Sequence, residues 1–456
     1  MVRVSKMTRM FFAVVWLIIT FAECQWCNGV NSQNMTYISW IAILNLSLQT
    51  LTLKWCKIPL VSFFYAFIFF YYIFHFGQVL ILGLFPHYRL DYLNYVDTYM
   101  TDVKVLKETI KVCVVSINAF FIGGLLAKNC IARKEFNNSN VPAIIKKMFF
   151  LLFPFRLLVD TVQLFSALFL GYYGAIHAEN MIPGVITSLG NMWYALVPLY
   201  YLILDTKTKK RNCIIFIVIY IVVTMLTGNR GHQIVCLASL MIVILSTLNR
   251  IKFSTIVKYC LIVFAGLFFI DIIYSMRETS ILEFLSNPTA FMESTKDSNI
   301  LLETIGTFGE TIYTPYLTIQ GNGSEYHTWF GEAFVKSIVG IIPDVFGWFK
   351  ELNNAAIFPK NLGTESAIGG SFCGEMYYNF KDFYPLMSAF FGCIYCYLSN
   401  IAYKSIQTKR YEDAVMAIII CSLALWWVRD AIGNLTRQVV WMYWILLVFQ
   451  RKYSRI

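Results

Sequence analysis

The chain has 456 residues, of which 58% are hydrophobic and 17% aromatic, while only 14% carry a charged side chain. Soluble domains have about 25% charged residues, so this composition excludes a soluble enzyme. The net charge of +11 would attract nucleic acid, but the Lys and Arg residues lie in short segments between apolar blocks, and no basic patch for DNA or RNA is left. The apolar blocks predict an all-α integral membrane protein, because each is long enough to cross a hydrocarbon core of about 30 Å.

About twelve apolar segments are expected to span the membrane as helices. In chain order they cover residues 8–22, 37–53, 58–85, 109–127, 148–170, 181–204, 213–227, 234–248, 256–274, 383–402, 414–428 and 439–450. The first resembles a signal peptide, but the sequence FAECQWC that follows has no clear cleavage site, so the segment is expected to stay as an anchor. In this sequence Cys24 and Cys27 have a spacing that permits a disulfide in an oxidising compartment. The remaining Cys residues show no zinc spacing, and no metal site is predicted.

The distribution of basic residues predicts the orientation in the membrane. One set of alternate connections, together with both termini, holds 23 of the 37 Lys and Arg residues. Since such residues concentrate on the inner side, both termini are predicted to be cytoplasmic. We therefore expect a membrane region of about nine helices over 1–274, a large external loop over 275–382 and a second membrane region of about three helices over 383–456.

The external loop is too long for a passive connection, because unstructured loops beyond about 15 residues are uncommon. Residues 329–349 combine aromatic side chains with an apolar run that Pro343 interrupts, which favours an amphipathic helix at the membrane interface. Nearer the end of the loop, Gly369, Gly370 and Gly374 would permit a close approach of the backbone to a ligand.

A short turn, TGNRGHQ at residues 227–233, contains the first candidate site residues. Arg230 offers a planar, permanently charged fork for phosphate oxygens, and His232 can transfer a proton near neutral pH. The alternative is an ordinary turn at a helix end, with an Arg that extends to lipid phosphates.

Further external Arg residues strengthen the phosphate interpretation. Arg429 and Arg437 lie eight residues apart in RDAIGNLTR, and Arg277 lies at the start of the large loop. If these segments meet the TGNRGHQ turn, their guanidinium groups could hold a pyrophosphate. In the alternative, Arg429 only pairs with a nearby acid such as Asp430.

Glu375 is a candidate general base, with Tyr378 and Asn379 beside it to contact sugar hydroxyls. A base must reach the attacking hydroxyl; structural capping by Glu375 is equally compatible with the sequence, and His232 is the competing base. A second polar pair, Arg156 and Asp160, has the i, i+4 spacing of two charges that neutralise each other on one helix face.

Three of these segments together resemble the O-antigen polymerase (Wzy-type oligosaccharide repeat-unit polymerase) family. They are TGNRG in an external turn, GGSFCGEMYYNF at the end of a long outer loop, and a late external RDAIGNLTR. The resemblance implies a GT-C-like helical fold in the bacterial inner membrane. It also implies a glycosyltransferase that uses no metal or nucleotide cofactor and moves a growing glycan from undecaprenyl pyrophosphate to a lipid-linked repeat unit on the periplasmic face.

By position, the resemblance assigns the donor pyrophosphate to Arg230, Arg429 and Arg437, and the acceptor hydroxyl to Glu375 and Asn379. His232 has no counterpart in the family pattern. A chain-length regulator is the protein partner that the family suggests, beside membrane lipids and the two lipid-linked substrates.

Two other functions remain open. An O-antigen ligase uses the same donor and is expected to have a His in its outer loop, where His327 lies. A flippase for lipid-linked sugars would also have about twelve spans, but it predicts short external loops and charged residues in both halves.

Overall fold

The computed structural model describes residues 6–27, 35–90, 94–128, 140–227, 231–248, 299–321, 331–343 and 369–453, with the isolated positions 282 and 286. Throughout these ranges the regular structure is helical, without a strand. The longer helices of the first half are α1 (Lys6–Cys27), α2 (Met35–Trp55), α3 (Phe63–Leu84), α5 (Val103–Leu126), α6 (Val141–Met181), α7 (Gly184–Ile203), α8 (Lys207–Met225) and α9 (Gly231–Ser246).

The second half begins with shorter helices and ends with long ones. They are α13 (Ile300–Gly309), η3 (Glu310–Ile312), α14 (Tyr313–Gln320), α15 (Glu332–Val339), α17 (Phe372–Phe380), η4 (Lys381–Phe383), α18 (Tyr384–Gln407), η5 (Tyr411–Ala414), α19 (Val415–Ala424), η6 (Trp426–Arg429) and α20 (Ile432–Tyr453). One short helix of the first half, α4 (Tyr95–Thr98), completes the described structure.

The prediction of an all-α membrane protein is confirmed. Eleven of the expected apolar segments overlap described helices, and the remaining one, 256–274, lies outside the described residues. Six described helices are long and apolar enough to cross a membrane. They are Lys6–Cys27, Phe63–Leu84, Val103–Leu126, Val141–Tyr172, Phe372–Gln407 and Ile432–Lys452. The total of about twelve spans, the three regions and the GT-C-like topology stay predictions.

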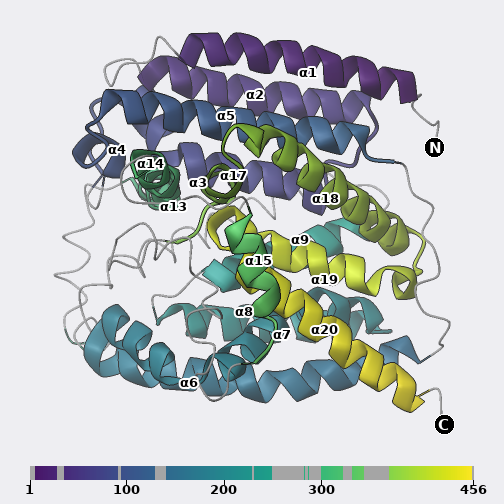
Figure 1. The fold of residues 1–456 in the computed structure, drawn as a ribbon. Helices are drawn as coiled ribbons and strands as arrows, with labels where there is room; N and C mark the ends of the chain where they lie inside the picture. Colours follow the sequence, from purple (N-terminus) through teal and green to yellow (C-terminus); the bar gives the residue numbers. More distant parts are fainter. Residues whose placement is uncertain are drawn as a thin grey trace.

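The helices are stacked on one another with their long axes roughly parallel (Figure 1). Helices α1, α2, α3 and α5 make up one side of the stack, α6, α7 and α8 the other, and α9, α18, α19 and α20 lie between them. The start of α1 and the end of α20 lie at the same end of the stack, on the right of Figure 1. The location of both termini on the cytoplasmic side stays a prediction.

The first helix is an integral part of the bundle. Trp16 is buried, and its indole nitrogen donates a hydrogen bond to Thr52 Oγ1 at 3.2 Å. Arg9, also buried, donates to the carbonyl oxygens of Ala127 and Cys56 at 3.2 and 3.4 Å. These contacts tie α1 to α2 and to the end of α5. Both nearby thiols, Cys24 and Cys27, are free.

An aromatic core joins the first helices to the end of the outer loop. Phe67 of α3 stacks on Phe120 of α5 at a ring-centre distance of 4.5 Å, and both rings meet the edge of Phe372, the first residue of α17, at 5.5 Å. Aromatic pairs in this range add roughly 0.5–1.5 kcal/mol each beyond their buried area. The segment with the candidate residues around Glu375 is therefore fixed to the centre of the bundle.

Candidate functional site

Two of the three segments that the sequence singled out meet at the start of α9. The position that a side chain would take at Gly231 lies 2.0 Å from the indole ring of Trp426, so only glycine fits against η6 here. The ring of His232 lies 5.3 Å from that of Trp426, centre to centre. The end of the TGNRGHQ turn is thus adjacent to η6, which leads into RDAIGNLTR, and His232 and Asp430 line the same cavity.

The third segment packs on the same place. A side chain at Gly370 would come within 2.5 Å of the carbonyl carbon of Asp430, and one at Gly369 within 3.1 Å of the carbonyl oxygen of Arg429. We expected these glycines to allow a ligand close to the backbone. In the structure they allow the backbone of the chain itself to approach, which brings residues 369–370 against the RDAIGNLTR segment.

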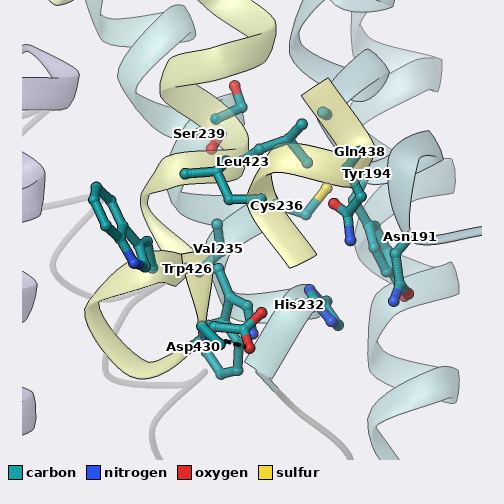
Figure 2. A pocket seen from close by; sticks show the side chains of 15 residues that line it. Asn191, Tyr194, His232, Val235, Cys236, Ser239, Leu423, Trp426, Asp430 and Gln438 are labelled. Atoms are coloured by element: carbon teal, nitrogen blue, oxygen red, sulfur yellow. Dashed lines mark hydrogen bonds between the residues drawn. The ribbon is translucent and has the colours of Figure 1, made fainter. Parts of the chain in front are cut away.

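A cavity of about 30 Å³ lies between α7, α9, α19, η6 and the start of α20. Figure 2 shows side chains from these elements around it, among them Asn191, Tyr194, His232, Trp426 and Asp430. This volume holds one or two water molecules, so a sugar enters only when the side chains move. The hydroxyl oxygens of Ser239 and Ser422, on the wall, are buried and have no hydrogen-bond partner among the described residues.

An unpaired buried hydroxyl costs roughly 1–3 kcal/mol, so these two oxygens favour a polar occupant. His232 adds an imidazole ring and Gln438 adds an amide. The cavity lies between apolar helices at the junction of two of the three segments, and its wall combines apolar side chains with these polar groups.

Glu375 is fully buried in α17 and serves as an anchor for α20. Its Oε2 atom accepts hydrogen bonds from the Trp427 indole nitrogen at 2.8 Å and from the Ile432 backbone nitrogen at 3.0 Å; the same nitrogen lies 3.1 Å from Oε1. Ile432 is the first residue of α20, where backbone N–H groups have no partner within the helix and a negative charge is stabilising. This arrangement is the capping alternative of the sequence analysis.

Tyr378, Asn379 and Arg437 all contact α15 or the turn after it. Asn379 Oδ1 accepts from the Ala333 backbone nitrogen at 2.9 Å, and the Tyr378 hydroxyl donates to Glu332 at 3.3 Å. Arg437 Nε donates to the Gly340 carbonyl oxygen at 2.7 Å. Within the segment 329–349, α15 is the described part of the expected amphipathic helix, and these three residues hold both of its ends.

Arg429 lies beside the cavity-lining Asp430 but pairs with a different acid. Its Nη2 atom is 3.9 Å from Glu310 Oε2, and its guanidinium lies 5.9 Å from the centre of the Phe74 ring. A pair at this separation, in partly exposed side chains, contributes about 0–1 kcal/mol. The guanidinium is therefore held only weakly by this pair.

Asp430 turns back onto the first turn of α20. Its Oδ1 atom accepts from the Ala431 backbone nitrogen at 2.8 Å and from Asn434 Nδ2 at 2.9 Å. Burial outweighs these bonds and raises the pKa of Asp430 to about 6. The cavity thus has a carboxyl group that changes charge near neutral pH.

The remaining candidates, Arg230 and Arg277, lie outside the described residues, as does His327. Within the described ranges no group of three or more His, Cys, Asp and Glu side chains is placed to hold a metal ion. The sequence analysis did not identify Asn191, Tyr194 and Trp426 as cavity residues. Each lies in an apolar helical run that is typical of a buried helix. The one available signal was the position of Trp426 just before RDAIGNLTR.

A comparison with models of protein families shows to which family the chain belongs. The model of the family described as O-antigen polysaccharide polymerase Wzy matches residues 8–455. The chain belongs to this family. The resemblance inferred from the three segments is confirmed, and with it a general role as an O-antigen polymerase, a glycosyltransferase-like activity on lipid-linked oligosaccharide repeat units, and a multi-pass membrane location. No curated protein and no solved structure matches the chain.

Proposed function

We propose that this Wzy-family chain transfers a growing glycan from undecaprenyl pyrophosphate to a lipid-linked repeat unit on the periplasmic face of the inner membrane, without a metal or nucleotide cofactor. The observation that carries the proposal is that the TGNRGHQ turn and the RDAIGNLTR segment meet at one cavity, with Gly369 and Gly370 packed on the second of them. Family membership supports a polymerase in general; the donor, the face and the site residues are the proposed part.

In the proposed reaction a hydroxyl oxygen of the acceptor sugar attacks the anomeric carbon of the donor glycan. The new C–O bond forms as the bond to pyrophosphate breaks, and the pyrophosphate leaves on its polyprenyl carrier. The hydroxyl proton passes to a base, and the leaving group gains negative charge that must be stabilised. One basic group and a set of fixed positive charges are therefore required.

We assign the base to His232, because its side chain lines the cavity. Glu375, the second candidate, has both carboxylate oxygens engaged by N–H groups at the start of α20, and we propose that it positions the RDAIGNLTR segment. In this assignment Tyr378 and Asn379 hold α15 against the site.

The leaving pyrophosphate is assigned to Arg429, Arg230 and Arg277. The weak pairing of Arg429 with Glu310 supports the first of these, and Arg230 precedes Gly231, which contacts Trp426. Arg437 donates its Nε–H group to Gly340, so its proposed contribution is to hold α15 against the site. Multiple guanidinium groups suit a phosphate because each offers two parallel N–H donors.

The test is the pattern of surface polysaccharide on a gel. Cells that lack the chain are complemented with wild type, Arg429→Gln or His232→Gln at matched protein levels. A polymerase predicts a single repeat unit on the lipid core in the deletion strain and a long ladder with wild type alone. Bare core with accumulated lipid-linked polymer would instead indicate a ligase, and repeat units left on the cytoplasmic face would indicate a flippase.

A further inference from the structure

A buried network of polar side chains lies directly behind the cavity wall. Arg156 of α6 is 2% exposed, and its Nε atom donates to Asp160 Oδ2 at 2.8 Å while Nη2 donates to Asp160 Oδ1. Tyr220 of α8 donates its hydroxyl to the same carboxylate. The i, i+4 pair expected from the sequence is therefore present, and it is part of a larger network.

This network reaches the cavity through α7. Arg156 Nη1 donates to Asn191 Oδ1 at 2.7 Å, and the Arg156 guanidinium lies 5.0 Å from the centre of the Tyr194 ring. Asn191 and Tyr194 both line the cavity, opposite the segment with Trp426 (Figure 2). A structural ion pair alone would not need these two contacts.

The chemistry of the Arg156–Asn191 bond fixes the orientation of the amide. A guanidinium group only donates hydrogen bonds, so the atom of Asn191 that faces it must be the carbonyl oxygen. The Asn191 amide nitrogen, with its two N–H groups, is then the end left for the cavity. Without Arg156 the amide could rotate and present either its oxygen or its nitrogen.

We propose that Arg156 is a positioning residue that fixes the Asn191 amide as a hydrogen-bond donor to an oxygen atom of the bound saccharide. The inference rests on the proposed function, because it takes the cavity as the saccharide site. Asn191 is the group that touches the substrate, and Arg156 acts through it. Lysine does not replace Arg156, since a single ammonium cannot hold both Asp160 oxygens and Asn191 in the fixed geometry of a fork.

The decisive variant is Asn191→Asp, which has nearly the same shape but only acceptor atoms at the cavity. Its carboxylate gains an ion pair with Arg156, so the variant is expected to fold at least as well as wild type. Loss of one donor to a bound oxygen is expected to weaken binding roughly tenfold. Purified protein in nanodiscs is assayed for saturation binding of a radiolabelled lipid-linked repeat unit, for polymer formation and for Tm.

The expected result is a KM and a Kd for the repeat unit roughly tenfold above wild type, with kcat and Tm little changed. Arg156→Lys is expected to raise KM and Kd by the same factor. The double variant Arg156→Lys, Asn191→Asp should show no further increase in either constant, because the two residues act through one contact. Asn299→Asp is the matched control: it makes the same chemical change on an exposed side chain whose oxygen caps α13, and it should leave both constants unchanged.

Two results would overturn the inference. One is a Kd and a KM for Asn191→Asp within twofold of wild type at equal amounts of folded protein. The other is a decline in activity that follows a decline in Tm, which indicates a purely structural role. A wild-type protein that binds the repeat unit but forms no polymer would refute the proposed function instead, and the binding measurement would still decide the role of Asn191.

Discussion

The two roles open to Glu375, base and anchor, predict different outcomes for the substitution Glu375→Gln. A glutamine carbonyl oxygen placed at the Oε2 position keeps the bonds from Trp427 and Ile432 at 2.8 and 3.0 Å. The amide nitrogen of glutamine then takes the Oε1 position, where it cannot accept the second contact of the Ile432 N–H group. The free energy of unfolding should therefore fall by about 1 kcal/mol.

The substitution Glu375→Ala removes both acceptors. The Trp427 indole and the Ile432 amide then remain buried without a partner, at roughly 1–3 kcal/mol each, so a loss of about 2–6 kcal/mol is expected. The order wild type, Gln, Ala in Tm, measured in nanodiscs, is the signature of an anchor. Glu108→Gln serves as the control, because this carboxylate is partly exposed and pairs only with Lys111 at the surface; its Tm should not change.

Activity is the second readout. If Glu375 positions the segment, Glu375→Gln should polymerise nearly as fast as wild type per folded molecule. A glutamine cannot accept the proton, and removal of a general base costs roughly 10²–10⁴ in rate. A decline of that size in kcat, with Tm lowered only slightly, would refute the anchor assignment and make Glu375 the base in place of His232.

Three further results follow from the geometry. Because the pKa of Asp430 is raised to about 6 in the fold from about 3.9 in the unfolded chain, the free energy of unfolding falls as pH rises between these values, by about 3 kcal/mol at most. Asp430→Asn should therefore raise Tm at pH 7 but not at pH 4, and an equal gain at both would contradict this. His232→Gln should slow polymerisation about 10²-fold or more at unchanged Tm, whereas near-normal turnover would rule out the base role. Gly370→Ala places a carbon 2.5 Å from the Asp430 backbone and should cost about 1–3 kcal/mol, while Gly184→Ala, with open space around it, should not change Tm.

The helices were predictable from sequence because membrane spans depend on composition over about 20 residues rather than on tertiary contacts. The expected segment 414–428, for example, covers α19 and η6. The alternation of basic connections placed TGNRGHQ and RDAIGNLTR on one predicted side of the membrane, which allowed them to meet but did not by itself predict that they would. Such alternation assigns a side, and a site in a helical bundle needs its residues on the same side.

The partners of individual side chains were not predictable in the same way. Glu375 pairs with a backbone N–H of residue 432, a group that every residue except proline possesses. Arg429 pairs with Glu310, 119 positions earlier, rather than with its neighbour Asp430, which turns to the first turn of α20. Asn191 was not identified, because an amide in an apolar run carries no signal until a donor such as Arg156 is found beside it.

The division between anchors and cavity residues determines how variants of this chain must be interpreted. Glu375, Asn379 and Arg437 each bond to backbone groups at helix ends, so substitutions that break these bonds are expected to lower activity by releasing α20 or α15 from the site. His232 lines the cavity, and its loss should remove activity from a protein that is still folded. Both kinds of variant shorten a polysaccharide ladder in cells. Only activity per folded molecule, measured beside Tm, separates the residues that build the site from those that act in it.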